Sequence, residues 1–122
     1  MQANHVDFTN TFRDLRQAQK PTGGIYAQQS FAAWYMRWQA RRQQNTQTLE
    51  DSIALMRSSN PAVIPRNHKV EEALEAAYAD DLKPFYALLH VLKTPYDSDA
   101  VPTAYQTPPL PHERVYETFC GT

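Results

Sequence analysis

The sequence predicts an all-α fold of about five helices that ends in a proline-rich, extended C-terminal arm. Apolar residues recur at helical spacing in successive segments up to residue 93, as they do in helices with one buried face. No segment alternates apolar and polar residues in the way of a half-buried strand. The last 29 residues hold five of the nine prolines and keep no helical period. We therefore divide the chain into a helical module at 1–93 and an arm at 94–122.

The first two predicted helices each present an aromatic face. Phe8, Phe12 and Leu15 recur at helical spacing, and the segment PTGG at 21–24 is expected to end this helix. In the next segment, SFAAWYMRWQARRQQ, Ser30 is a suitable N-cap because its hydroxyl can accept a hydrogen bond from a backbone N–H of the first turn. The apolar face of this second helix consists of Phe31, Trp34, Tyr35 and Trp38.

A third helix is predicted to begin near Thr48. Thr48 and Asp51 have the spacing of a capping box in which Asp takes the place of the usual Glu. The apolar face of this helix consists of Leu49, Ile53 and Met56. Pro61 and Pro65 then exclude a continuous helix, so residues 60–65 are expected to form a rigid connector.

Two further helices are predicted before the arm. The segment RNHKVEEALEAAYA is rich in Ala, Glu and Leu, which all favour helix. The last helix can begin at Asp81 and tolerate Pro84, because a proline in the first turn removes no intrahelical hydrogen bond. The residues expected to face the core are Val70, Leu74 and Ala77 in the fourth helix and Phe85, Leu88, Leu89 and Leu92 in the fifth.

The bulk properties limit the class of protein. A length of 122 residues suits a modest core, and a net charge of -1 gives no general attraction to nucleic acid or to an anionic membrane. No stretch approaches the roughly 18–20 apolar residues that a membrane-spanning helix needs. The single cysteine excludes an internal disulfide framework and suits a reducing compartment. We therefore expect a cytoplasmic protein without a membrane partner.

The aromatic face of the second helix has two interpretations. With Arg37, Arg41 and Arg42 nearby, it has the composition of a surface that stacks bases and contacts phosphates of single-stranded nucleic acid. Aromatic residues at one helical face are, however, what a core-facing helix requires, and this explains their spacing without a ligand. We therefore predict a core helix and no nucleic-acid partner.

The motif NPAVIPRNH contains the other polar residues that could form a functional site. His68 and Glu72 have the i,i+4 spacing of two metal ligands, but no second pair of ligands accompanies them, so a solvated pair is favoured and no metal site is predicted. We expect the motif residues to be structural, with polar side chains that satisfy backbone groups around the connector and cap the following helix. These residues are Asn60, Pro61, Arg66, Asn67 and His68. No catalytic residue is predicted.

Cys120 is the one thiol of the chain and is the third residue from its end. A catalytic nucleophile needs a base held at a fixed distance, and His112 lies eight positions before Cys120 in a tail that is expected to be flexible. A cysteine this close to a free end also gains little from burial. From the residues alone, two interpretations stay open: a thiol without a role, and a thiol that pairs with another one outside this chain.

Five stretches of the sequence together resemble a known family in their order and spacing. They are DFTNTFRDL, FAAWYMRWQARRQ, MRSSNPAVIPRNHKVEEALEAA, LLHVLKTPYD and the terminal FCGT. The block NPAVIPRNHKVEEAL is the most specific of them. Across almost the whole chain, these stretches resemble the C-terminal region of the selenoprotein O family, also called YdiU-like protein adenylyltransferases.

The resemblance implies a much longer parent enzyme with an upstream kinase-like domain. That domain binds ATP and Mg²⁺ and transfers AMP to Ser, Thr or Tyr hydroxyls of substrate proteins. None of its nucleotide- or metal-binding residues maps onto this chain, so the segment alone is expected to hold no cofactor and to be no enzyme. The resemblance also implies that Cys120 is redox-regulatory and pairs with a cysteine of the kinase-like domain.

The sequence thus predicts a non-catalytic C-terminal helical segment that packs on the kinase-like domain of an adenylyltransferase and carries a regulatory cysteine. Cut from that domain, it should expose apolar surface and self-associate. The alternative is a free-standing helical module that binds another protein through the aromatic helix or the arm.

Overall fold

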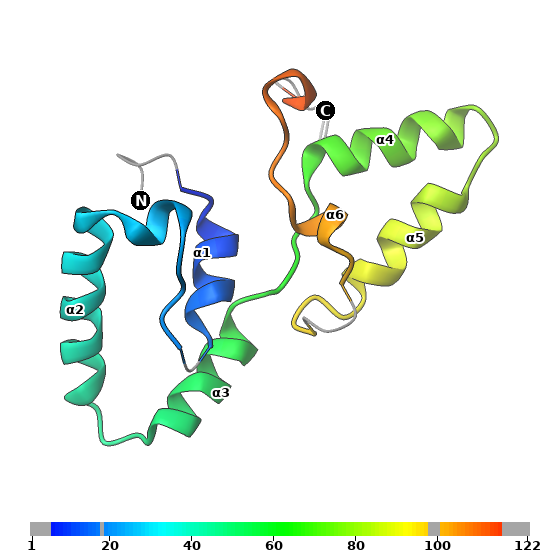
Figure 1. The fold of residues 1–122 in the computed structure, drawn as a ribbon. Coiled ribbons are helices and arrows are strands. Elements are labelled where there is room, and N and C mark those ends of the chain that lie inside the picture. Colours follow the sequence, from blue (N-terminus) through cyan, green and yellow to red (C-terminus); the bar gives the residue numbers. More distant parts are fainter. Residues whose placement is uncertain (1–5, 18, 98–100, 116–122) are drawn as a thin grey trace, which may run out of the picture. The chain divides into compact units, whose positions relative to one another are not determined.

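The chain folds into helices joined by turns and extended segments (Figure 1). The computed structural model describes residues 6–17, 19–97 and 101–115, and within these ranges it contains no strand. The predicted all-α class is therefore confirmed. The chain divides into two compact units, Met1–Asn60 and Pro61–Thr122. This division lies at the proline connector and differs from the predicted boundary at residue 93.

Unit 1 begins with helix α1 (Phe8–Leu15). Asp7 caps it, since its carboxylate oxygen accepts a hydrogen bond of 2.8 Å from the N–H of Asn10. The helix ends well before PTGG, so the prediction that this segment ends it is wrong. Gly23 and Gly24 have φ angles of 79° and 47°, which favour glycine, and they lead the chain into the 3₁₀ helix η2 (Gly24–Ala27).

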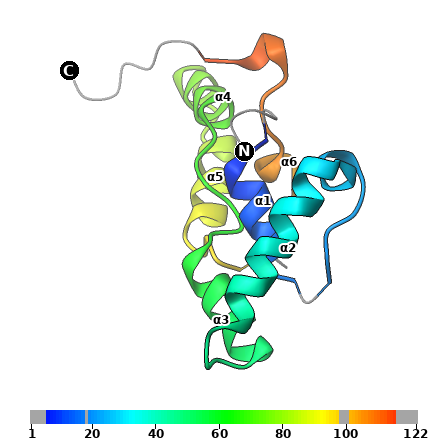
Figure 2. The same ribbon diagram turned by 90° about the vertical axis from the view of Figure 1, so that its left-hand side faces the viewer.

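The other two helices of unit 1 are α2 (Gln29–Gln43) and α3 (Leu49–Ser59), which Figure 2 shows from a second side. The N-cap of α2 is Gln28, which makes no side-chain cap hydrogen bond, so the prediction of Ser30 as N-cap is wrong. The capping box of α3 is confirmed. The N–H of Asp51 donates to Oγ1 of Thr48 over 3.1 Å, and the N–H of Thr48 donates to the Asp51 carboxylate over 3.4 Å.

The core of unit 1 is largely aromatic. Leu15 of α1 packs with Phe31 and Tyr35 of α2, and all three side chains are buried. Partly buried apolar residues surround this cluster: Phe12, Tyr26, Trp34, Trp38 and Met56. The core interpretation of the aromatic face is therefore confirmed. Leu49, which was expected on the apolar face of α3, is 50% exposed.

Unit 2 begins with two helices, α4 (Asn67–Tyr78) and α5 (Lys83–Leu92), that pack side by side as a hairpin (Figure 1). Asp80 has a φ of 64° in the turn between them. The carboxylate of Asp81 accepts a hydrogen bond of 3.1 Å from the N–H of Lys83, at the start of α5. Pro84 lies in the first turn, as predicted.

The hairpin buries small and aliphatic side chains. Ala73 of α4 is buried, as are Leu88 and Val91 of α5. Three residues that were expected to be buried are in fact exposed, namely Leu74 at 39%, Phe85 at 41% and Leu89 at 39%. Helical periodicity marks the whole apolar stripe of a helix, but the neighbouring helix covers only part of it.

The connector and the arm are held together within unit 2. The N–H groups of Ala62 and Val63, both buried, donate to the backbone oxygen of Pro95 over 2.6 and 3.3 Å. Two short helices follow in the arm, α6 (Thr103–Gln106) and the 3₁₀ helix η3 (Pro111–Glu113). Thr107, Leu110 and Arg114 have extended backbone. Among the residues described, no helix is long and apolar enough to cross a membrane.

Candidate functional site

The motif NPAVIPRNH is divided between the two units. Asn60 is the C-cap of α3 in unit 1, where its Nδ2 donates to the backbone oxygen of Met56 over 2.9 Å. The backbone oxygen of Asn60 accepts a hydrogen bond of 3.2 Å from Nη1 of Arg16. Pro61 is the first residue of unit 2. Asn60 therefore ends a helix of unit 1, whereas the motif residues from Pro61 onward belong to unit 2.

Arg66, Asn67 and His68 lie at the start of α4 and line a groove of about 380 Å³. Pro109 and Arg114 of the arm also line it. Arg66 is the N-cap of α4 but makes no side-chain cap hydrogen bond, so the expected capping by this residue is not seen. Its Nη2 instead donates to the backbone oxygen of Gln106 over 3.2 Å. Arg66 thus ties the arm to the start of α4.

The carboxylate of Glu113 lies among basic groups near this groove. The N–H of Leu110 donates to the Glu113 carboxylate over 2.8 Å, and this hydrogen bond lowers the pKa of Glu113. The charges of His68, His112 and Lys69 act in the same direction. The carboxylate of Glu113 therefore partly offsets the positive charge at the start of α4.

The predicted pair of His68 and Glu72 is not formed. Glu72 pairs with Lys69 instead, at an Nζ–Oε2 distance of 2.5 Å. Nδ1 of His68 is buried and has no hydrogen-bond partner among the described residues. In the ranges that the structure describes, no group of three or more His, Cys, Asp or Glu side chains is arranged so that it could hold a metal ion. Cys120, the predicted redox residue, lies outside those ranges.

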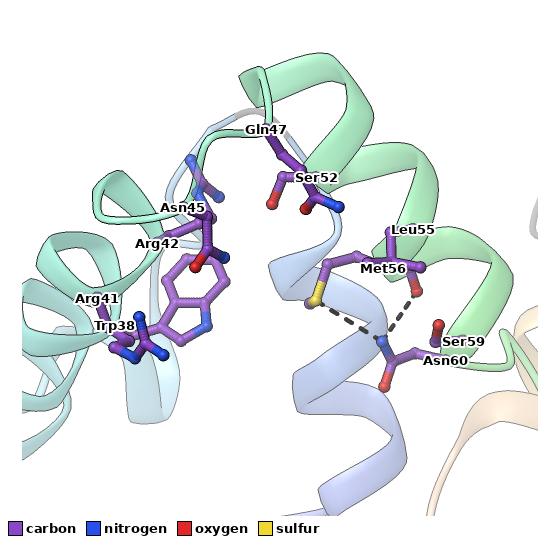
Figure 3. Close-up of a pocket in the computed structure, with 10 residues that line it drawn as sticks. All are labelled: Trp38, Arg41, Arg42, Asn45, Gln47, Ser52, Leu55, Met56, Ser59 and Asn60. Carbon is purple, nitrogen blue, oxygen red and sulfur yellow. Dashed lines mark hydrogen bonds between the residues drawn. The ribbon is translucent and has the colours of Figure 1, made fainter.

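A second groove lies entirely within unit 1, between the end of α2 and α3 (Figure 3). It has a volume of about 310 Å³. Its apolar lining comes from Trp38, Leu55 and Met56, and two arginines, Arg41 and Arg42, lie at its α2 side. Its other lining residues carry amides or hydroxyls: Asn45, Gln47, Ser52, Ser59 and Asn60.

Trp38 and Arg42, which both line this second groove, are in direct contact. The guanidinium carbon of Arg42 lies 4.8 Å from the centroid of the Trp38 ring, a cation–π contact. The indole in turn stacks on Trp34 at a centroid distance of 6.1 Å. The sequence pointed to the arginines and aromatic residues of α2. It gave no sign that Leu55 and Ser52 of α3 lie opposite them, because that follows from how the two helices are joined.

Comparison with known proteins gives consistent matches. A family model described as protein adenylyltransferase SelO matches residues 1–93. Proteins named protein nucleotidyltransferase YdiU are similar over the entire chain. Identity is 49% for the protein of Alcanivorax borkumensis, 47% for that of Nitrosococcus oceani and 48% for that of Syntrophotalea carbinolica. Each alignment covers 100% of this chain but 25% of the relative. The chain therefore spans about a quarter of the length of these relatives.

Proposed function

Because this chain belongs to the protein adenylyltransferase SelO family, we propose that it is the non-catalytic, C-terminal helical segment of a longer enzyme. That enzyme transfers AMP from ATP to Ser, Thr or Tyr hydroxyls of proteins, with ATP and Mg²⁺ held by a kinase-like domain upstream. The observation that carries the proposal is the coverage of 25% in relatives that match the chain from end to end.

The exposed apolar row of unit 2 supports packing against the rest of such an enzyme. Phe85 and Leu89 lie one helical turn apart on α5 and are 41% and 39% exposed. Leu82 and Tyr86 add further exposed apolar surface at the start of the same helix. Apolar surface of this kind is stabilised when a partner covers it. We propose that the kinase-like domain is this partner and that the isolated segment self-associates through the same row.

The proposed position of the segment at the C-terminal end of a longer enzyme is tested by sequencing the gene on both sides of this region. A reading frame that continues upstream of Met1 for about three times the length of this segment, and ends after Thr122, would support a C-terminal segment. A frame that extends downstream of Thr122 would overturn that placement. A frame confined to these residues would favour the free-standing interaction module.

The packing surface is tested by substitution. Phe85→Ser with Leu89→Ser should shift the isolated segment from oligomer to monomer in sedimentation-velocity experiments. His90→Ser, an exposed polar position on the same helix, is the matched control and should leave the distribution unchanged. An unchanged distribution in the double variant would rule out this row as the surface of self-association.

The regulatory proposal concerns Cys120 in the full-length enzyme. Two thiols would lose two electrons and two protons to form one disulfide, and a disulfide oxidant such as oxidised glutathione would take up both. Labelled AMP transferred to protein should then differ between oxidised and reduced wild-type enzyme and stay constant in Cys120→Ser. If wild type and variant respond alike to the oxidant, the regulatory role of Cys120 is wrong.

A further inference from the structure

The groove between α2 and α3 of unit 1 has the composition of a binding site for an acidic peptide segment. Arg41 and Arg42 line it, and no carboxylate does. Neither arginine forms an ion pair with any residue that the structure describes, whereas Arg13 pairs with Asp14 at 2.9 Å. Two guanidinium groups beside one groove, without a counter-charge, favour an anionic occupant.

The contact with Trp38 prepares one of these arginines for such an occupant. Because the Arg42 guanidinium lies over the indole ring at 4.8 Å, part of its rotamer freedom is already lost before anything binds. An arginine held in this way gives up less entropy when its planar fork meets a carboxylate, and the pair can then form two parallel hydrogen bonds. The site is therefore suited to a carboxylate.

Part of the groove lining is apolar, so a ligand that fills the groove needs an apolar group in addition to a carboxylate. Leu55 is 53% exposed, and it lies with Met56 on α3 opposite the arginines (Figure 3). A volume of about 310 Å³ accommodates more than one side chain. Ser52 and Gln47 offer further hydrogen-bonding groups along the groove. The complementary ligand is thus a peptide in which Asp or Glu adjoins an apolar residue.

We propose that this groove holds an acidic–apolar segment from the part of the full-length protein outside these 122 residues. The inference rests on the proposed function, since it requires that this chain is part of a longer enzyme. About three quarters of the length of the relatives lies outside the aligned region. A segment on the same polypeptide meets the groove at a high effective concentration, so even a modest intrinsic affinity would keep it bound.

Photo-crosslinking of the full-length protein tests this proposal. A benzophenone amino acid is placed at Gln47, which lines the groove and is exposed. Irradiation should give an intramolecular crosslink to a segment with Asp or Glu next to an apolar residue, located by mass spectrometry. Arg41→Gln with Arg42→Gln should lower the yield roughly tenfold, as expected when charge-assisted hydrogen bonds are lost. Arg37→Gln, on α2 but outside the groove lining, should leave the yield unchanged.

A second probe position separates failure of this inference from failure of the proposed function. The same amino acid at Phe85 reports on the apolar row of α5. A crosslink to the rest of the protein from Phe85 but none from Gln47 would overturn the groove proposal alone. Absence of both would overturn both proposals. A crosslink from Gln47 that joins two copies, or that captures added polynucleotide, would assign the groove to another occupant and overturn the proposal.

Discussion

The Nη1 of Arg16 donates a hydrogen bond of 3.2 Å to the backbone oxygen of Asn60, across 44 positions of sequence. Arg16 follows the last residue of α1 and is 4% exposed, and Asn60 caps the end of α3. The carbonyl groups at a helix C-terminus carry partial negative charge, which a guanidinium stabilises. This contact therefore joins the first and last helices of unit 1.

Replacing Arg16 should destabilise unit 1. Arg16→Met removes a hydrogen bond from a charged donor in a buried position, and such a loss typically costs about 1.5–3 kcal/mol. The free energy of unfolding from urea titration measures the effect. Arg57→Met, at an exposed arginine of α3, is the matched control and should change it by less than about 0.5 kcal/mol. Equal effects of the two substitutions would contradict a specific role for Arg16.

Tyr26 should make the stability of unit 1 depend on pH in the alkaline range. Burial, followed by the 2.6 Å hydrogen bond from its hydroxyl to Asp14, raises the pKa of Tyr26 above its ordinary value. The folded state therefore keeps this proton at a pH where the unfolded state has lost it. Because the unfolded state then binds fewer protons, the free energy of unfolding should fall as the pH rises above about 10.

A comparison of two tyrosine variants measures this dependence. Tyr26→Phe should be less stable than wild type at neutral pH by about 1 kcal/mol, since one hydrogen bond is lost. Its stability should also fall less steeply at alkaline pH. Tyr78→Phe, at a side chain that is 89% exposed, should retain the wild-type slope. An identical slope in Tyr26→Phe and wild type would exclude a contribution from Tyr26.

The capping box of α3 should contribute measurably to stability. Thr48→Ala removes both hydrogen bonds that its hydroxyl makes with Asp51, one accepted from the N–H and one of 2.7 Å donated to the carboxylate. A lost N-cap typically costs about 1 kcal/mol. Thr46→Ala, two residues earlier in the same loop, is exposed and should have little effect. Thermal or urea unfolding of both variants provides the test. An unchanged free energy of unfolding in Thr48→Ala would show that the capping box does not contribute to stability.

Neighbouring leucines of α5 should respond differently to the same substitution. Leu88 is 7% exposed and Leu89 is 39% exposed. At a concentration where the isolated segment is monomeric, Leu88→Ala should cost about 2–5 kcal/mol because it leaves a cavity in the hairpin, whereas Leu89→Ala should cost less than about 1 kcal/mol. Urea titration compares the two. A larger loss for Leu89→Ala would show that α5 presents a different face to α4.

Local signals in the sequence explain the parts of the fold that could be predicted. The capping box at Thr48, the tolerance of Pro84 and the aromatic face of α2 each depend on residues within one helix, where spacing alone determines the geometry. Errors arose at helix ends. The predicted N-cap, Ser30, lies inside α2, because the helix begins at Gln29 without a side-chain cap.

The sequence by itself determined the helical class and the membership of a family, because periodicity and specific motifs are properties of the chain. Only the tertiary structure decided which part of each apolar stripe is covered and which side chains meet across helices. Hydrogen bonds such as those from Ala62 to Pro95 and from Arg66 to Gln106 join residues far apart in sequence. Local spacing contains no information about such pairs, since they form only when packing brings the segments together.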